Sequence, residues 1–173
     1  AIEPLPRELP PQSWIVLAGD VEHIMLCGGA PGPGKSAADE AAERAIVTWL
    51  KATVRPGHKL ISICTGALIA ARAGLLDGYS CTTHYLSYDE LRAIAPRARI
   101  LENRLYVEDG ERYSSAGITA GIDLMLHLVH QSTDQSCAVA IARYLVVYLR
   151  RSGSDPQLSP WLEGRNHIHP AVH

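Results

Sequence analysis

The sequence predicts an α/β fold built on a mostly parallel sheet with helices on both faces. Short apolar runs alternate with helical patterns in the first half of the chain, which is the order that parallel strands with crossover helices require. Three runs, at residues 14–18, 24–27 and 59–64, have the length and composition of buried strands. Two long periodic segments, residues 119–130 and 135–150, predict helices in the second half.

The shorter elements have clear boundary signals. Ser36 is a suitable N-cap for a helix that reaches about Thr53, because its hydroxyl can accept a bond from the first-turn amides. The remaining expected elements are helices at residues 65–73 and 88–94, strands at 80–83, 99–101, 104–108 and 112–115, and a hairpin turn at Asp109-Gly110.

The chain divides into three parts. Residues 1–13 are proline-rich and predict a lead-in, residues 14–151 form the α/β domain, and residues 152–173 predict a linker. Few strands precede Cys64 for a sheet of this class, and we therefore expect the natural protein to extend upstream of Ala1.

The last predicted helix is apolar near its end. We expect these side chains in the core, with some of them against a dimer partner: Tyr144, Leu145, Val147 and Tyr148.

Composition excludes several classes of function. A chain of 173 residues with 47% hydrophobic and 20% charged residues is typical of one soluble globular domain. The net charge of −2 provides no basic surface for nucleic acid. The four cysteines lack the spacing of a disulfide scaffold or a zinc site, so we expect reduced thiols, a cytoplasmic location, no metal and no cofactor. No run approaches the roughly 18 apolar residues of a membrane span.

Cys64 lies where a buried strand passes into a helix, in the segment ISICTGALIAARAGLLDG. There the thiol faces the first-turn amides, whose partial positive charge favours the thiolate and predicts a lowered pKa. Thr65 and Gly66 complete the turn, and the small Gly66 lets the backbone approach a bound group. The alternative is a buried cysteine acting as a small hydrophobic side chain, which is the commoner role.

His84, in CTTHYL, is the natural partner for such a thiol, because imidazole can accept a proton near neutral pH. The sequence contains eight histidines, and any one of them is more often structural than catalytic. Spacing alone does not establish that His84 lies near Cys64.

Three segments carry a resemblance to a known family: SICTGALIAARAGLLDGYSCTTHY, RLYVEDGERYSSAGITAGIDLMLHLV and ARYLVVYLRRSGSDPQLSPWL. They resemble the ThiJ/PfpI superfamily and, more narrowly, the N-terminal sensor domain of GlxA-type AraC-family transcriptional regulators. The resemblance implies a flavodoxin-like three-layer sandwich of the class I glutamine amidotransferase-like kind. It also implies a homodimer with Cys64 at a nucleophile elbow and His84 beside it.

The same resemblance implies a ligand pocket at this elbow. Its residues would be Gly28, Gly29, Cys64, Thr65, His84, Ser115, Gly117, Thr119 and Asp123. Asp123 has an alternative role, since an acid early in a helix also stabilises the helix N-terminus.

The expected function is that of a ligand-sensing domain in an AraC-type regulator. Residues 152–173 resemble the connector to a helix-turn-helix domain, so DNA would be contacted only through a domain beyond His173. The sensor would bind a small-molecule effector. In the family, an upstream strand carries a carboxylate that pairs with the cysteine. That stretch has no counterpart before residue 14, and we therefore favour sensing over catalysis.

Two other functions remain open. In a cysteine-dependent hydrolase, hydratase or amidase, Cys64 would be the nucleophile and His84 the general acid and base. Residues 29–36 also match the P-loop pattern, with Lys35 on phosphate and Ser36 on Mg²⁺. Against nucleotide binding, Pro33 removes an amide from the cradle, and no strand ending in Asp follows to complete the magnesium site.

Overall fold

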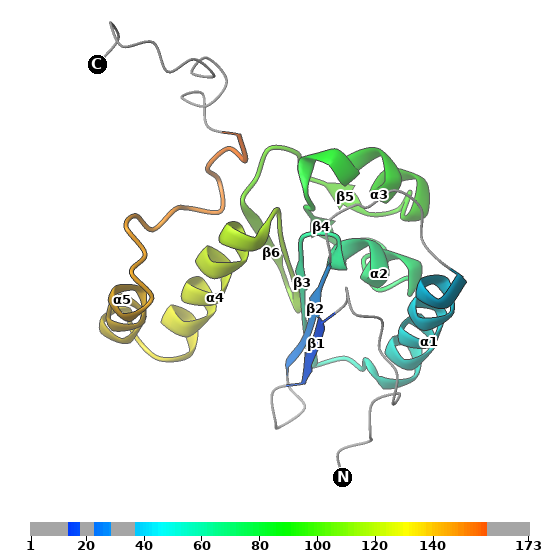
Figure 1. Cartoon of the computed structure of the whole chain (residues 1–173), viewed down its shortest axis with the longest axis horizontal. Coiled ribbons are helices and arrows are strands. Elements are labelled where there is room, and N and C mark those ends of the chain that lie inside the picture. The colour runs from blue at the N-terminus through cyan, green and yellow to red at the C-terminus, as the bar shows by residue number, and fades with distance from the viewer. Residues whose placement is uncertain (1–13, 18–22, 29–36, 159–173) are drawn as a thin grey trace, which may run out of the picture.

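The structure is a computed structural model that describes residues 14–17, 23–28 and 37–158 (Figure 1). The strands are β1 (Trp14–Leu17), β2 (His23–Cys27), β3 (Lys59–Ile63), β4 (Ser80–Cys81), β5 (Arg99–Ile100), β6 (Tyr106–Asp109) and β7 (Arg112–Ser115). The helices are α1 (Ala37–Thr53), α2 (Gly66–Arg72), the 3₁₀ turn η1 (Tyr85–Ser87), α3 (Tyr88–Ile94), α4 (Ile118–Ser132) and α5 (Gln135–Tyr144).

Five strands form the main sheet in the order β1-β2-β3-β7-β6, and β4 and β5 form a small parallel pair. The three central strands are parallel, whereas β1 and β6 pair antiparallel at the two edges. Cys27 pairs with Ile63, and Ile63 pairs with Ser115, so these three strands end side by side. In α/β sheets ligands bind beyond such carboxyl ends, and the residues that follow them are therefore the natural place for a site.

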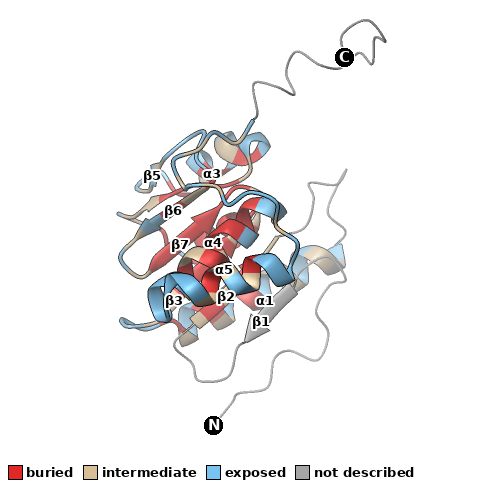
Figure 2. Ribbon diagram, turned by 90° about the vertical axis from the view of Figure 1, so that its left-hand side faces the viewer, coloured by how far each residue is buried: buried red, intermediate tan, exposed pale blue. Residues whose placement is uncertain are grey.

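Helices cover both faces of the sheet, as Figure 1 shows. On one face α1, α2 and α3 enclose a large cluster that includes Ile24, Leu26 and Leu60. On the other face α4 packs against Ile61 and Tyr113, and α5 packs against α4. In Figure 2, α5 is mostly exposed and β7 is buried, while α4 has one buried side and one exposed side. The predicted α/β class, with a mostly parallel sheet and helices on both faces, is confirmed.

The last helix is shorter than the sequence predicts. It ends at Tyr144, and Val146 follows in the left-handed region with φ of 57°. The amides of Val146 and Val147 donate to the carbonyls of Arg143 and Ala142, which is a Schellman end with valine where glycine is usual.

The apolar residues beyond this helix end are not in the core, which corrects the prediction for Tyr144, Leu145 and Tyr148. Tyr144 is 88% exposed and Tyr148 is fully exposed, whereas Val147 is half-buried. Beyond this helix end, Arg151 binds the buried carboxylate of Asp123 on α4.

Candidate functional site

Cys64 lies in a strained turn between β3 and α2. Its φ is 56°, which L-residues with a side chain rarely adopt, and its side chain is buried. The backbone N–H of Cys64 donates to the carbonyl of Ser115 over 3.0 Å, and the hydroxyl of Thr83 donates to the carbonyl of Cys64 over 2.9 Å. These contacts come from β7 and from the loop after β4, and they hold a conformation that costs about 1–3 kcal/mol.

Two glycines allow the chain to pack closely around this turn. A Cβ atom on Gly28 would lie 1.9 Å from the Thr65 hydroxyl, and one on Gly66 would lie 2.3 Å from the Leu26 carbonyl oxygen. The N–H of Gly28 donates to the Ile63 carbonyl over 3.0 Å. The structure therefore places Gly28 directly against the Cys64 turn, whereas Gly29 lies outside the described residues.

Burial raises the pKa of the Cys64 thiol, and the hydrogen bond from the Thr65 amide lowers it by less. The expected lowering is wrong, because desolvation penalises the thiolate more than one amide stabilises it. A protonated, buried thiol is a weaker nucleophile than an exposed thiolate.

The His84 side chain is half-buried and caps η1. Its Nδ1 accepts a hydrogen bond from the Leu86 amide over 3.3 Å, and its ring stacks on Tyr85 with centroids 4.5 Å apart. Neutral His84 therefore carries its proton on Nε2 and offers a donor there. The ring also lies beside Gly117, where a Cβ atom would be 3.9 Å from Cδ2. No hydrogen bond joins His84 to Cys64, both of which are described.

Ser115 adds an unsatisfied polar group at the end of β7. Its side chain is fully buried, and its Oγ has no hydrogen-bond partner within the described parts of the chain. Such a hydroxyl costs about 1–3 kcal/mol when it is left unpaired, and a polar ligand could satisfy it. The backbone of Ser115 meets Cys64, so this group lies next to the strained turn.

Thr119 and Asp123 lie in the first turns of α4, which begins after Gly117. Thr119 is exposed. Asp123 is buried, and its carboxylate accepts from the backbone N–H of Arg151 over 3.1 Å and from the guanidinium Nε over 2.8 Å. Asp123 thus anchors the segment that follows α5.

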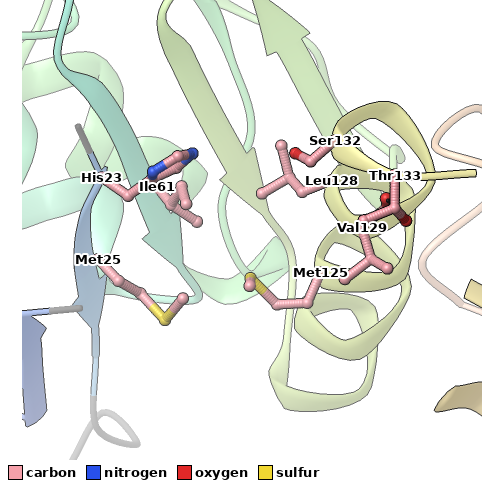
Figure 3. A pocket seen from close by; sticks show the side chains of 8 residues that line it. All are labelled: His23, Met25, Ile61, Met125, Leu128, Val129, Ser132 and Thr133. Atoms are coloured by element: carbon pink, nitrogen blue, oxygen red, sulfur yellow. Dashed lines mark hydrogen bonds between the residues drawn. The ribbon is translucent and has the colours of Figure 1, made fainter. Parts of the chain in front are cut away.

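The structure shows an apolar cavity of about 230 Å³ that the sequence analysis did not predict (Figure 3). It lies between α4 and the amino-terminal part of the sheet, away from Cys64, since His23 is the first residue of β2. Its lining is His23, Met25, Ile61, Met125, Leu128, Val129, Ser132 and Thr133. Methionines on β2 and α4 face one another across it, so periodicity within one element could not reveal it.

Other kinds of site receive no support from the described residues. The P-loop-like residues 29–36 lie outside them. Within the described ranges no three His, Cys, Asp or Glu side chains converge as metal ligands. Nor is any helix in those ranges long and apolar enough to cross a membrane.

Residues 12–131 match the model of the DJ-1/PfpI family. The chain belongs to this family. The HTH-type transcriptional regulator GbdR of Pseudomonas aeruginosa is 32% identical over 153 residues, which are 88% of this chain and 40% of that protein. Isonitrile hydratase of Pseudomonas putida is 34% identical over 111 residues, which are 64% of this chain and 45% of that enzyme. The chain thus spans less than half the length of these two DJ-1/PfpI relatives.

A solved AraC family transcriptional regulator from Pseudomonas putida has a similar structure, with a TM-score of 0.58 and 27% identity. The match covers 72% of this chain and 63% of that one. The predicted resemblance to the ThiJ/PfpI superfamily and to AraC-type regulators is confirmed.

Proposed function

We propose that this DJ-1/PfpI domain senses a small-molecule effector for an AraC-type transcription regulator. The observation that carries the proposal is the 32% identity with the regulator GbdR over 88% of the chain. The regulator would act in the cytoplasm as a homodimer, and it would contact DNA through a domain beyond residue 173.

The Cys64 turn favours binding over catalysis. Burial raises the pKa of the thiol, and the Nδ1 of His84 is occupied by the Leu86 amide, so proton transfer from Cys64 to His84 has no ready acceptor. The unpaired Oγ of Ser115 and the Nε2 donor of His84 instead suit a small polar ligand. The proposed pocket also includes Gly28 and Thr65.

A ligand screen tests this proposal. Thermal shift with amino acids, small carboxylates and small amides should find a compound that raises the Tm, and calorimetry should give its Kd. Ser115→Ala should weaken binding about tenfold, because one hydrogen bond in a dry site is lost.

Ser62→Ala is the matched control. Its Oγ is also buried and unpaired, and Ser62 pairs with Ser114 in the interior of the sheet. Equal weakening by both variants, or no stabilising compound from these classes, would count against a sensor site at Ser115.

The second candidate is a cysteine-dependent enzyme, which the similarity to isonitrile hydratase favours. In that case the chain should hydrate an isonitrile to the N-substituted formamide, and Cys64→Ser should abolish turnover. Cys137→Ser, on α5, should leave turnover unchanged. Such a result would reverse the order of the two proposals.

A further inference from the structure

Residues 151–158, which begin seven positions after the α5 end at Tyr144, lie against the domain on the side of the Cys64 turn. We call them the strap, and they form the orange segment in Figure 1. At its start, Arg151 binds the carboxylate of Asp123, with Nε and NH2 at 2.8 and 2.7 Å from Oδ2. Asp123 is only 3% exposed at its side chain, so this is an anchor in the protein interior.

The middle of the strap fits closely against the residues before β6. The amide of Leu105 donates to the carbonyls of Gly153 and Asp155, over 3.0 and 3.1 Å. A Cβ atom on Gly153 would lie 2.7 Å from the carbonyl oxygen of Tyr106, so only glycine allows this approach. Leu105 in turn accepts from the amide of Ala116, one residue after Ser115.

Gln157 joins three segments near the end of the strap. Its side-chain N–H groups are shared among the carbonyls of Thr83 and Arg104, each at 2.9 Å, and the hydroxyls of Thr82 and Tyr88. Its backbone N–H donates to the Asn103 side-chain oxygen over 2.9 Å. One amide group thus ties together the loop after β4, the start of α3 and the loop before β6.

The contact of Gln157 with Thr83 continues directly to Cys64. The carbonyl of Thr83 accepts from Gln157, while the hydroxyl of Thr83 donates to the Cys64 carbonyl. His84 is the next residue in the chain, so the contacts that fix the Thr83 backbone also restrict the position of His84. The strap therefore holds both segments beside Cys64: Thr83 and His84 through Gln157, and the start of α4 through Arg151.

We propose that Gln157 is a positioning residue that holds Thr83 and His84 against the Cys64 turn and couples this turn to the strap. A displacement of His84 or Cys64 weakens the hydrogen bond between Gln157 and Thr83. Conversely, loss of the Gln157 hydrogen bonds makes the Cys64 turn more mobile. The role of this coupling in signalling rests on the proposed sensor function, whereas the coupling itself does not.

Cysteine alkylation by iodoacetamide, resolved by mass spectrometry, tests the coupling in the full 173-residue chain. In Gln157→Ala, alkylation of Cys64 should accelerate about five- to tenfold, because the hydrogen bonds that fix Thr83 are lost. The amides of Cys64 and Ser87 should exchange hydrogen faster by a similar factor. Cys137, half-buried on α5, should react at an unchanged rate.

Gln131→Ala is the matched control. Gln131 also donates two side-chain bonds, both to Glu108, and it lies in the last turn of α4. Tyr88→Phe is a second test variant, because it removes one hydroxyl that binds Gln157 and leaves the strap otherwise intact. It should accelerate Cys64 alkylation about two- to threefold.

The reverse experiment uses wild-type protein alkylated at Cys64. Because coupling is reciprocal, hydrogen exchange at the Leu105 amide, which binds the strap, should rise by a similar factor. The proposal is overturned if Gln157→Ala frees the Leu105 amide while Cys64 alkylation stays within about twofold of wild type. The proposal is also overturned if Gln131→Ala accelerates Cys64 alkylation as much as Gln157→Ala does, since the effect would then be general destabilisation.

Both measurements omit effector and DNA, so the two proposals can fail separately. If Gln157→Ala accelerates Cys64 alkylation but no compound in the ligand screen raises the Tm, the coupling proposal stands and the sensor proposal fails. If a ligand binds at Ser115 but Gln157→Ala leaves Cys64 alkylation unchanged, the sensor proposal stands and the coupling proposal fails.

Discussion

The two faces of the sheet are packed to different degrees. The face beneath α1, α2 and α3 holds one continuous cluster of buried side chains, which includes Leu26, Leu50 and Leu91. Beneath α4 the buried cluster is much smaller, and the cavity lined by Met25 and Met125 lies beside it, between α4 and the sheet. Within the described residues, stability is therefore concentrated on the first face. The second face has room to adapt.

Truncation of two adjacent residues on β3 tests this difference most strongly. Leu60 points into the enclosed cluster, whereas Ile61 lines the cavity on the opposite face. Leu60→Ala should lower the free energy of unfolding by about 4 kcal/mol, and Ile61→Ala by about 2 kcal/mol, because the cavity can rearrange. Urea denaturation measures both. Equal losses would show that the two faces are packed alike.

Addition of a methyl group should also destabilise the first face more than the second. Gly66→Ala should cost about 3 kcal/mol, because its Cβ would meet the backbone oxygen of Leu26. Gly121→Ala, on α4, would meet only the side chain of Ile63 at 3.0 Å, and it gains about 1 kcal/mol of helix propensity. We expect a net change near zero there. Thermal unfolding of both variants checks this, and a large loss in Gly121→Ala would mean that the α4 face is rigid.

The better-packed face should also give the protein its sensitivity to alkaline pH. Burial, with a contribution from Asp109, raises the pKa of Cys81 from 9.0 to about 11. The folded state therefore binds this proton more tightly than the unfolded chain does. The stability that results is complete below pH 9.0 and is lost progressively as pH rises to about 11.

Urea denaturation across this pH range should show a loss of about 2–3 kcal/mol. Cys81→Ala should remove most of it. The remaining slope belongs to the thiols of Cys27 and Cys64 and to the phenols of Tyr106 and Tyr113, because burial raises the pKa of all four groups. An unchanged slope in Cys81→Ala would assign the alkaline loss to these four groups instead.

The smallest expected effect is a gain at the end of α5. Val146 is 86% exposed and has φ of 57°, so its side chain contributes strain and little packing. Val146→Gly should raise the free energy of unfolding by about 0.5–1 kcal/mol. Val139→Gly, inside the same helix, should lower it by a similar amount and serves as the control. A loss in Val146→Gly would show that the valine packs against something in solution.

Local patterns were enough to predict most of the fold. The helix at residues 88–94 and the strand at 112–115 have the predicted bounds, and the other strands begin within two residues of prediction. The hairpin turn lies one residue later, at Gly110 and Glu111. Each of these elements is determined by its own periodicity and by glycine or proline at its ends.

The site was predictable only in part. The rule that parallel strands end together correctly brings Cys64 and Ser115 into contact. The pKa of Cys64 was not predictable, because it depends on burial by residues from other elements. The end of α5 at Tyr144 was not predicted, because the helical pattern of the sequence continues through residue 150. Nor was the Arg151–Asp123 pair, whose members lie 28 positions apart. The role of the pocket residues in ligand binding stays a prediction.

The Arg151–Asp123 pair has a practical consequence for the smallest unit that can fold. A protein shortened to residue 150 would contain every helix and strand that the structure describes, yet the buried carboxylate of Asp123 would have lost its cation. Removal of one partner from a fully buried pair costs about 3–5 kcal/mol. We expect a smaller loss here, about 1–3 kcal/mol, because the Arg151 side chain is one-third exposed. We therefore expect the isolated domain to be more stable when it extends past Arg151 to Gln157, whose side chain binds Thr83 and Arg104, beyond the last helix that the structure describes.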